Sequence, residues 1–455
     1  MTIRICRMKK TGQMVRLSSS VLLLLTALLV NTISLASEIP AKAQDHPIAL
    51  VGATIHPVSG PVIEHGTILF DKGKIVAIGA SVDLPKGTES IDASGKHVYP
   101  GMIDSRTTLG LVEIGSVRAT RDVSETGSIN PNIRAEVAVN PESEVIPVSR
   151  ANGVTLAMTM PEGGVIGGTS AVIALDGWTW EEMTYKAPAG LVVNWPSMTI
   201  NRAWWERRSE EDQKKARDKA LNELRNAFKD ARSYVQAKRS ESNGNPVYHK
   251  TDLRWEAMAP ALDGKIPVLL DAEEIQQIEA AVAWAEQENL KLVIMGGYDS
   301  WRVAELLKAK HIPVIASPML RLPWRRYEEY DEPMALPKKL YEAGVQFCIA
   351  GDSDPSNERN LPYHAAMAAS YGLPKDEALK AVTLYPAQIL GIADRVGSLE
   401  VGKDATLIVT DGDPLEIKSN VRMEFIQGKT ISLASRHTHL YDKYKEKYRR
   451  MGIGK

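Results

Sequence analysis

Apolar and polar residues alternate with a period of two near both ends of the chain. In the N-terminal part, the alternation covers residues 49–55, 66–70 and 71–79, and the pair Lys72-Gly73 is typical of a tight hairpin turn. In the C-terminal part, residues 397–409 and 421–429 show short strand patterns with glycine turns. We therefore predict two small β segments that pair into one β-sandwich, built from both ends of the chain.

Between these segments, short apolar runs alternate with helical patterns. The predicted strands cover Pro100 to Asp104, Val154 to Thr159, Ser170 to Leu175, Leu191 to Trp195, Ile266 to Leu270, Leu292 to Met295, Pro313 to Ala316 and Gln346 to Ala350. Helices are predicted at 273–288, 301–308 and 336–343, and Gly344 ends the last of them. Eight strands interleaved with helices predict an α/β fold, a closed parallel (β/α)8 barrel of the TIM type.

The segment 203–241 departs from this short repeat. Leu221, Leu224 and Phe228 begin a narrow apolar stripe, while the other positions carry charges of both signs. This pattern predicts one long, solvated helix on the barrel surface. Trp204 and Trp205 precede it, either as a cover for the barrel mouth or as packing anchors.

The composition favours small molecules as the binding partners of this protein. The 455 residues are 44% hydrophobic and 24% charged, and 55 basic residues balance 56 acidic ones for a net charge of -1. A chain of this kind buries a large core and has no basic surface for nucleic acid. Of the two cysteines, Cys6 lies near the N-terminus and Cys348 lies in a buried-strand pattern, where we expect a packed thiol.

The N-terminal 43 residues have the pattern of a secretory signal peptide. Basic residues precede the apolar run of residues 21–30, and small residues follow at 34–36 and 41–43. The apolar run is too short to span a bilayer comfortably, although an uncleaved anchor is the alternative. We expect an exported protein, periplasmic or extracellular, with no membrane contact after cleavage.

Two motifs resemble a known family. Residues 100–104, Pro-Gly-Met-Ile-Asp, resemble the first barrel strand of the amidohydrolase superfamily, in its imidazolonepropionase-like branch. Residues 394–405 resemble the closing signature of the same superfamily, where the chain returns to the sandwich. The resemblance implies a sandwich from residues 46–99 and 393–435, a barrel from 100–392 and a tail from 436–455.

That family holds a catalytic metal with imidazoles, and this chain departs from its pattern. The resemblance implies a His pair after the first barrel strand, where this chain has Arg106 and Thr108. Asp271 stands where the family has a His after the fifth strand, and no His follows the sixth. A guanidinium does not ligate metals. We therefore predict no metal site of the usual kind. A hard cation held by Asp271, Asp352 and Asp354 is an alternative.

Asp352 aligns with the proton-shuttling Asp of the family. By resemblance, the protein is a hydrolase of non-peptide carbon–nitrogen bonds, acting on a cyclic amide or a related small substrate. We predict Asp352 and Asp271 as catalytic residues, and Arg106 and Thr108 as substrate-binding residues, with no cofactor assigned. Arg106 facing Asp271 and Asp352 either replaces the metal electrostatically or forms a structural ion-pair network. The other class of function is a catalytically inactive relative that binds a ligand or partner outside the cytoplasm.

Overall fold

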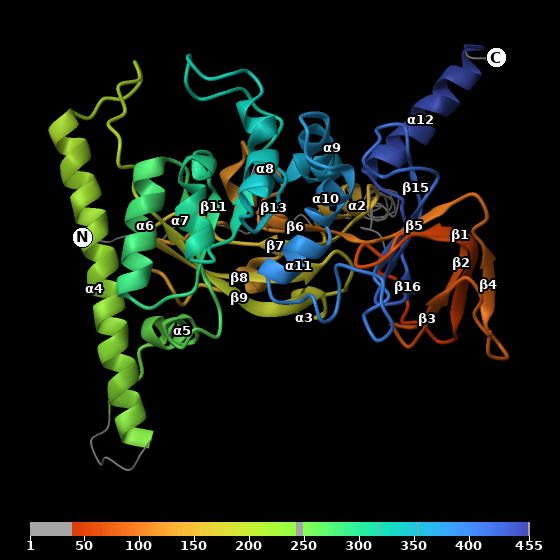
Figure 1. The fold of residues 1–455 in the computed structure, drawn as a ribbon, viewed down its shortest axis with the longest axis horizontal. Helices are drawn as coiled ribbons and strands as arrows, with labels where there is room; N and C mark the ends of the chain where they lie inside the picture. Colours follow the sequence, from red (N-terminus) through yellow and green to blue (C-terminus); the bar gives the residue numbers. More distant parts are fainter. Residues whose placement is uncertain (1–38, 243–248, 317, 353, 454–455) are drawn as a thin grey trace, which may run out of the picture. The chain divides into compact units, whose positions relative to one another are not determined.

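The computed structural model describes residues 39–242, 249–316, 318–352 and 354–453 (Figure 1). Residues 1–38, which hold most of the predicted leader, lie outside the described residues. Export and leader cleavage therefore stay predictions. In the described part of the chain, no helix combines the length and apolar character needed to cross a membrane.

Eight strands form the barrel sheet, in the order β13-β12-β11-β10-β9-β8-β7-β6. They are β6 (Met102–Thr107), β7 (Val154–Thr159), β8 (Ile166–Ala174), β9 (Thr184–Asn194), β10 (Val268–Ala272), β11 (Leu292–Gly296), β12 (Val314–Ala316) and β13 (Phe347–Ile349). The two end strands meet, because Ser105 Oγ on β6 lies 3.1 Å from Cys348 Sγ on β13. All eight predicted strands are present, and the sheet is a nearly closed barrel of the TIM type, as predicted.

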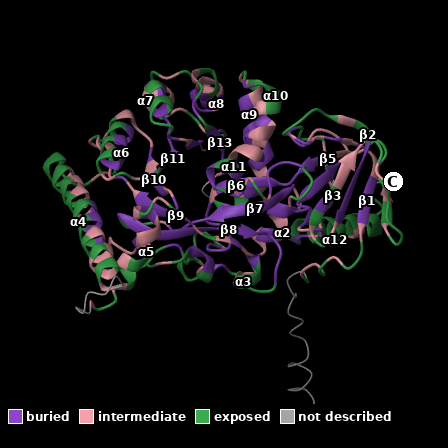
Figure 2. Ribbon diagram, turned by 60° about the horizontal axis from the view of Figure 1, so that its bottom comes forward, coloured by how far each residue is buried: buried purple, intermediate pink, exposed green. Residues whose placement is uncertain are grey.

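The barrel interior is packed with apolar side chains. Ile103, Leu156, Leu269 and Val293 point into it from different strands and are at most 3% exposed. Cys348 joins them, and burial raises the pKa of its thiol to about 12. The thiol is therefore a packing group, as expected. Figure 2 shows the barrel strands buried beneath more exposed helices.

One strand corrects the prediction of an all-parallel barrel. β8 runs antiparallel to both β7 and β9, whereas the other neighbouring pairs are parallel. The connection from β7 to β8 is a short loop in which Gly163 and Gly164 adopt positive φ angles of 83° and 67°. A parallel crossover needs a dozen or more residues, so this loop returns the chain as a hairpin.

Helices cover the outside of the second half of the barrel. The described α-helices are α2 (Val145–Arg150), α3 (Trp180–Met183), α4 (Glu210–Ser242), α5 (Leu253–Leu262), α6 (Ile275–Gln287), α7 (Ala304–Ala309), α8 (Glu332–Ala343), α9 (Leu361–Ser370), α10 (Lys375–Lys380), α11 (Leu384–Ile389) and α12 (Arg436–Arg450). Short 3-10 turns are η1 (Arg118–Thr120), η2 (Ala135–Ala138), η3 (Ser300–Val303) and η4 (Pro355–Asn360). α8 ends at Gly344, whose φ of 74° suits glycine, as the sequence predicts.

The long charged helix is α4, and its apolar stripe packs inward. Leu224, Phe228 and Ala231 are fully buried, and the Phe228 ring meets the Trp284 ring of α6 edge to face at 4.9 Å. Figure 1 shows α4 lying outside α5 and α6, at the edge of the barrel. The preceding Trp204 is 91% exposed.

Strands from both ends of the chain form a second sheet, which we call the terminal sheet. Its strands are β1 (Ile48–Ile55), β2 (Ile63–Asp71), β3 (Lys74–Gly79), β4 (Glu89–Asp92), β5 (His97–Pro100), β14 (Leu407–Thr410), β15 (Val421–Ile426) and β16 (Lys429–Thr430). β5 pairs with β14, which joins the two ends of the chain. The sheet curves until Phe70 and Phe425 pack against each other, with ring centroids 5.0 Å apart. β5 leads directly into β6, so the terminal sheet fixes the first barrel strand.

Candidate active site

Charged side chains gather where β6, β10 and β13 end. Arg106, near the end of β6, donates from Nη2 to Asp271 Oδ2 of β10 over 3.0 Å. The guanidinium is largely buried, with 19% of its side chain exposed, and Asp271 is 32% exposed. The structure thus brings together two of the predicted site residues, from segments far apart in the sequence.

Glu273 is a third member of this group. Its carboxylate accepts a hydrogen bond from the backbone N–H of Tyr298 over 3.0 Å and lies 3.9 Å from Arg106 Nη1. Burial raises the pKa of Glu273 to about 7, although the charge of Arg106 opposes this rise. Glu273 is therefore able to accept and release a proton near neutral pH.

Gly296, at the end of β11, makes room for this carboxylate. A Cβ at this position would lie 2.2 Å from Glu273 Oε1, and its φ of 85° also favours glycine. The place after the sixth barrel strand is thus filled by the side chain of Glu273, which directly follows the neighbouring strand β10.

A second arginine approaches from the loop after β12. The Arg321 guanidinium lies over the rings of Trp324 and Tyr298, at 4.2 and 5.2 Å from their centroids. Burial lowers the pKa of Arg321, and the charge of Glu273 partly offsets this effect. Arg106 and Arg321 both act electrostatically on Glu273, so the mouth holds two cations around one titratable acid.

Two buried carboxyl groups lie beneath Arg106. Asp104 is completely buried and accepts hydrogen bonds from the backbone N–H groups of Arg106 and Gly351, over 3.0 and 3.1 Å. A Cβ on Gly351 would lie 2.6 Å from Asp104 Oδ2 and 2.8 Å from Glu358 Oε2, so the two carboxyl groups converge at this glycine. Burial raises the pKa of both acids, and the charge of Asp104 raises that of Glu358 further. Burial and mutual repulsion therefore favour one shared proton over two negative charges in this pair.

Asp352 follows β13 and lies beside a buried histidine. Its carboxylate accepts hydrogen bonds from Asp354 N and Asn357 Nδ2, over 3.4 and 3.3 Å. His364 Nδ1 accepts from the backbone N–H of Met319 over 3.0 Å, and this bond places the imidazole proton on Nε2. Burial lowers the pKa of His364 to about 4, while the charge of Asp352 acts in the opposite direction. The imidazole is therefore neutral at physiological pH.

The other predicted residues lie as follows. Thr108 is 4% exposed in the turn after β6, where its carbonyl accepts from Leu111 N over 2.9 Å. A role for Thr108 in substrate binding stays a prediction. His437 and His439 lie on the exposed start of α12, and His437 Nδ1 is 3.0 Å from Arg359 Nη1.

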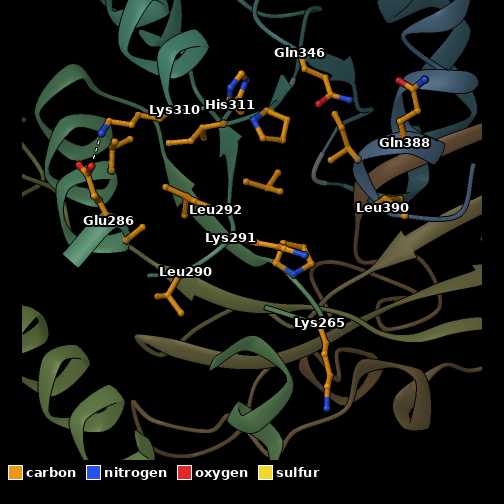
Figure 3. Close-up of a pocket in the computed structure, with 18 of the residues that line it drawn as sticks. Lys265, Glu286, Leu290, Lys291, Leu292, Lys310, His311, Gln346, Gln388 and Leu390 are labelled. Atoms are coloured by element: carbon orange, nitrogen blue, oxygen red, sulfur yellow. Dashed lines mark hydrogen bonds and ion pairs between the residues drawn. The ribbon is translucent and has the colours of Figure 1, made fainter. Parts of the chain in front are cut away.

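A pocket opens at the opposite end of the barrel. It has a volume of about 560 Å³ and lies at the amino ends of β10 to β13. Lys265, Lys291, Lys310, His311 and Glu286 line it, and Lys310 forms an ion pair with Glu286 (Figure 3). In barrels of this type, reactive groups lie at the carboxyl ends of the strands, so we place the candidate active site at Arg106 and not in this basal pocket.

Comparison with known proteins places the chain in a family. The model of the Amidohydrolase family matches residues 276–432. The crystal structure of an amidohydrolase from Thermotoga maritima MSB8 superposes with a TM-score of 0.76 and is 29% identical, covering 85% of this chain and 99% of its own. The chain belongs to the amidohydrolase superfamily.

Comparison with two curated relatives adds detail to the superfamily assignment. An imidazolonepropionase from Mesorhizobium japonicum is 26% identical over 370 residues, which are 77% of this chain and 87% of the relative. This superfamily member is therefore imidazolonepropionase-like. The amidohydrolase tasK of Hapsidospora irregularis is 24% identical over 390 residues, which span 80% of this chain and 39% of that longer protein.

The metal that the superfamily implies does not fit the residues present in this member. A guanidinium paired with Asp271 stands at one imidazole position, and the carboxylate of Glu273 fills the space beside Gly296. Within the described ranges, no group of three or more His, Cys, Asp or Glu side chains is arranged to hold a metal ion. The side chains present are therefore those of an acid–base site with cations.

Sequence reasoning missed Glu273, Arg321, Glu358 and His364. Glu273 had a usable signal, because it lies two residues after Asp271 and side chains two apart on a strand face the same side. Arg321, Glu358 and His364 come from loops and helices after the strands, where no periodicity indicates which side chains turn toward the barrel.

Proposed function

We propose that this amidohydrolase superfamily member hydrolyses non-peptide carbon–nitrogen bonds in small substrates, with cyclic amides as the first class to test. Glu273 carries the proposal, because its carboxyl group, which is 22% exposed and has a pKa of about 7, lies 3.9 Å from the guanidinium of Arg106. A general base is most effective when its pKa lies near the working pH.

Residues at the barrel mouth can carry out both proton transfers of the proposed hydrolysis. Glu273 takes a proton from a water molecule as the water oxygen attacks the amide carbon, and the carbonyl oxygen becomes an oxyanion. When the carbon–nitrogen bond breaks, the nitrogen takes the proton from Glu273, which leaves an amine and a carboxylic acid. Arg106 and Arg321 supply positive charge for the oxyanion or for a carboxylate of the substrate.

Asp271 contributes through Arg106, whose guanidinium it holds at 3.0 Å, and is in this proposal a positioning residue. Proton transfer by Asp352 stays a separate prediction, which Asp352→Asn tests in the same assay. The sequence pattern of residues 1–43 further supports the proposal that the reaction takes place outside the cytoplasm.

The proposal is tested by measuring turnover of a panel of cyclic amides, with and without a carboxylate substituent. We expect activity that persists after treatment with a chelator. Glu273→Gln should lower kcat/KM by about 10²- to 10⁴-fold. The matched control is Glu279→Gln, on the exposed side of α6, which should leave turnover unchanged.

The pH profile gives an independent result. Because Glu273 acts as a base, kcat/KM should rise with pH through about 7 and reach a plateau above it. The residual activity of Glu273→Gln should lack this rise. Full activity of Glu273→Gln, or activity restored only by added metal ions, would contradict the proposal.

A further inference from the structure

The C-terminal helix α12 has no buried residue. Every residue from Arg436 to Arg450 is exposed except Glu446, which is intermediate. Figure 1 shows α12 as a separate rod beside the terminal sheet, with the C-terminus at its far end. Helices of about 12–15 residues are marginal in water without tertiary packing, so a partner that covers one face would stabilise this one.

One face of the helix is aromatic and apolar. Leu440, Tyr441, Tyr444 and Tyr448 are 39%, 64%, 46% and 47% exposed. At 3.6 residues per turn they fall within about a third of the circumference, and Met451 follows in the same direction. We call these four residues the aromatic face of α12.

Positive charges flank this face. The helix contains six basic residues and two acidic ones, Asp442 and Glu446. The Nζ atoms of Lys445 and Lys447 lie 5.5 and 5.7 Å from the centroids of the Tyr441 and Tyr444 rings. By helical position, both acids lie on the side opposite the aromatic face.

We propose that the aromatic face of α12 docks onto the surface of an anionic lipid bilayer. Tyrosine rings suit the level of the headgroups, and lysines beside them reach the lipid phosphates with their long stems. A second copy of the helix would bring cation against cation, which disfavours a dimer through this face. The proposal replaces the expectation from the sequence that the processed protein does not contact a membrane.

Sedimentation with lipid vesicles tests this proposal on the processed protein. We expect binding to vesicles that contain phosphatidylglycerol, little binding to pure phosphatidylcholine, and release at high salt. Replacing Lys443, Lys445 and Lys447 by Gln should weaken binding on the order of 100-fold, at about fivefold for each lysine near the surface. Replacing Tyr441, Tyr444 and Tyr448 by Ser should also remove most of the binding.

Matched controls come from other exposed surfaces of the same chain. Tyr327→Ser with Tyr330→Ser removes rings that are 79% and 69% exposed, and Lys214, Lys215 and Lys219→Gln remove the charges of three lysines on α4. These variants should bind vesicles like the parent protein. Equal binding to neutral vesicles, unchanged binding by both α12 variants, or a dimer that the tyrosine variant dissociates would overturn the proposal.

Discussion

The two ends of the barrel differ in how they hold charge. At the carboxyl ends of the strands, Asp104 is fully buried, the side chains of Arg106 and Glu273 are 19% and 22% exposed, and burial raises the pKa of both acids. At the amino ends, the basal pocket has a volume of about 560 Å³, and Lys291 and Lys310 on its lining are exposed.

This difference in exposure shows why a cavity lined by charged residues is not by itself a reactive site. Burial changes the protonation of a group only when water is excluded from it, and an exposed lysine keeps its ordinary chemistry. At the carboxyl end, close pairing offsets the free-energy cost of removing charges from water, as between Arg106 and Asp271 at 3.0 Å. Substitutions at the two ends should therefore have very different effects.

The largest effect is expected at Arg106. Arg106→Met removes the cation that neutralises Asp271 and Glu273, and should lower kcat by about 10²- to 10³-fold if this guanidinium stabilises an oxyanion. The pKa of Glu273 should rise above about 7, because the charge of Arg106 opposes the effect of burial. Steady-state kinetics as a function of pH measures both quantities.

Lys291→Met is the control for this experiment, because it removes one positive charge from the opposite end of the barrel. It should change neither kcat nor the pH profile. If Arg106→Met keeps full activity with an unchanged profile, the charged network at the carboxyl end is structural only.

The sequence predicts the barrel well, because its strands have strong local signals. Residues 292–295 are continuously apolar, residues 154–159 are apolar except for two threonines, and the structure buries both runs on both faces. The antiparallel β8 was not predicted, since a buried strand has the same pattern in either direction. Only the length of the loop at Gly163 and Gly164 indicated a hairpin.

The candidate site was only partly accessible to sequence reasoning. Asp104, Arg106 and Asp271 follow apolar runs directly, so their place at a strand end was readable. His364 lies within a helix, and its burial depends on the loop at Met319, which donates to its Nδ1. Contacts of this kind join segments 45 residues apart, and no local pattern encodes them.

The next largest effect concerns acid stability and His364. Its pKa is about 4 in the folded chain against an ordinary value of 6.5, so the unfolded chain binds a proton that the folded chain does not. The stability from this group is complete above pH 6.5 and is lost as the pH falls toward 4. The loss amounts to about 3 kcal/mol.

Urea unfolding from pH 4 to pH 7 measures this slope. His364→Asn, which keeps an acceptor for Met319 N, should show a flatter dependence on pH. His311→Asn, in the basal pocket, should keep the slope of the parent protein. Equal slopes in the parent and in His364→Asn would show that this imidazole is not held neutral by burial.

The smallest effect is expected at the basal pocket itself. Lys291→Met combined with Lys310→Met removes two exposed charges and the ion pair with Glu286, and surface pairs of this kind contribute about 0–1 kcal/mol to folding. The free energy of unfolding should therefore change by about 1 kcal/mol or less, with turnover unchanged. Phosphate or a small dicarboxylate should not raise the melting temperature of the parent protein, because Lys310 is already paired and Lys265 is paired with Asp263 at 3.3 Å. A clear rise that the double variant abolishes would show that the amino end of the barrel binds anions. Both ends of the barrel would then hold functional charges.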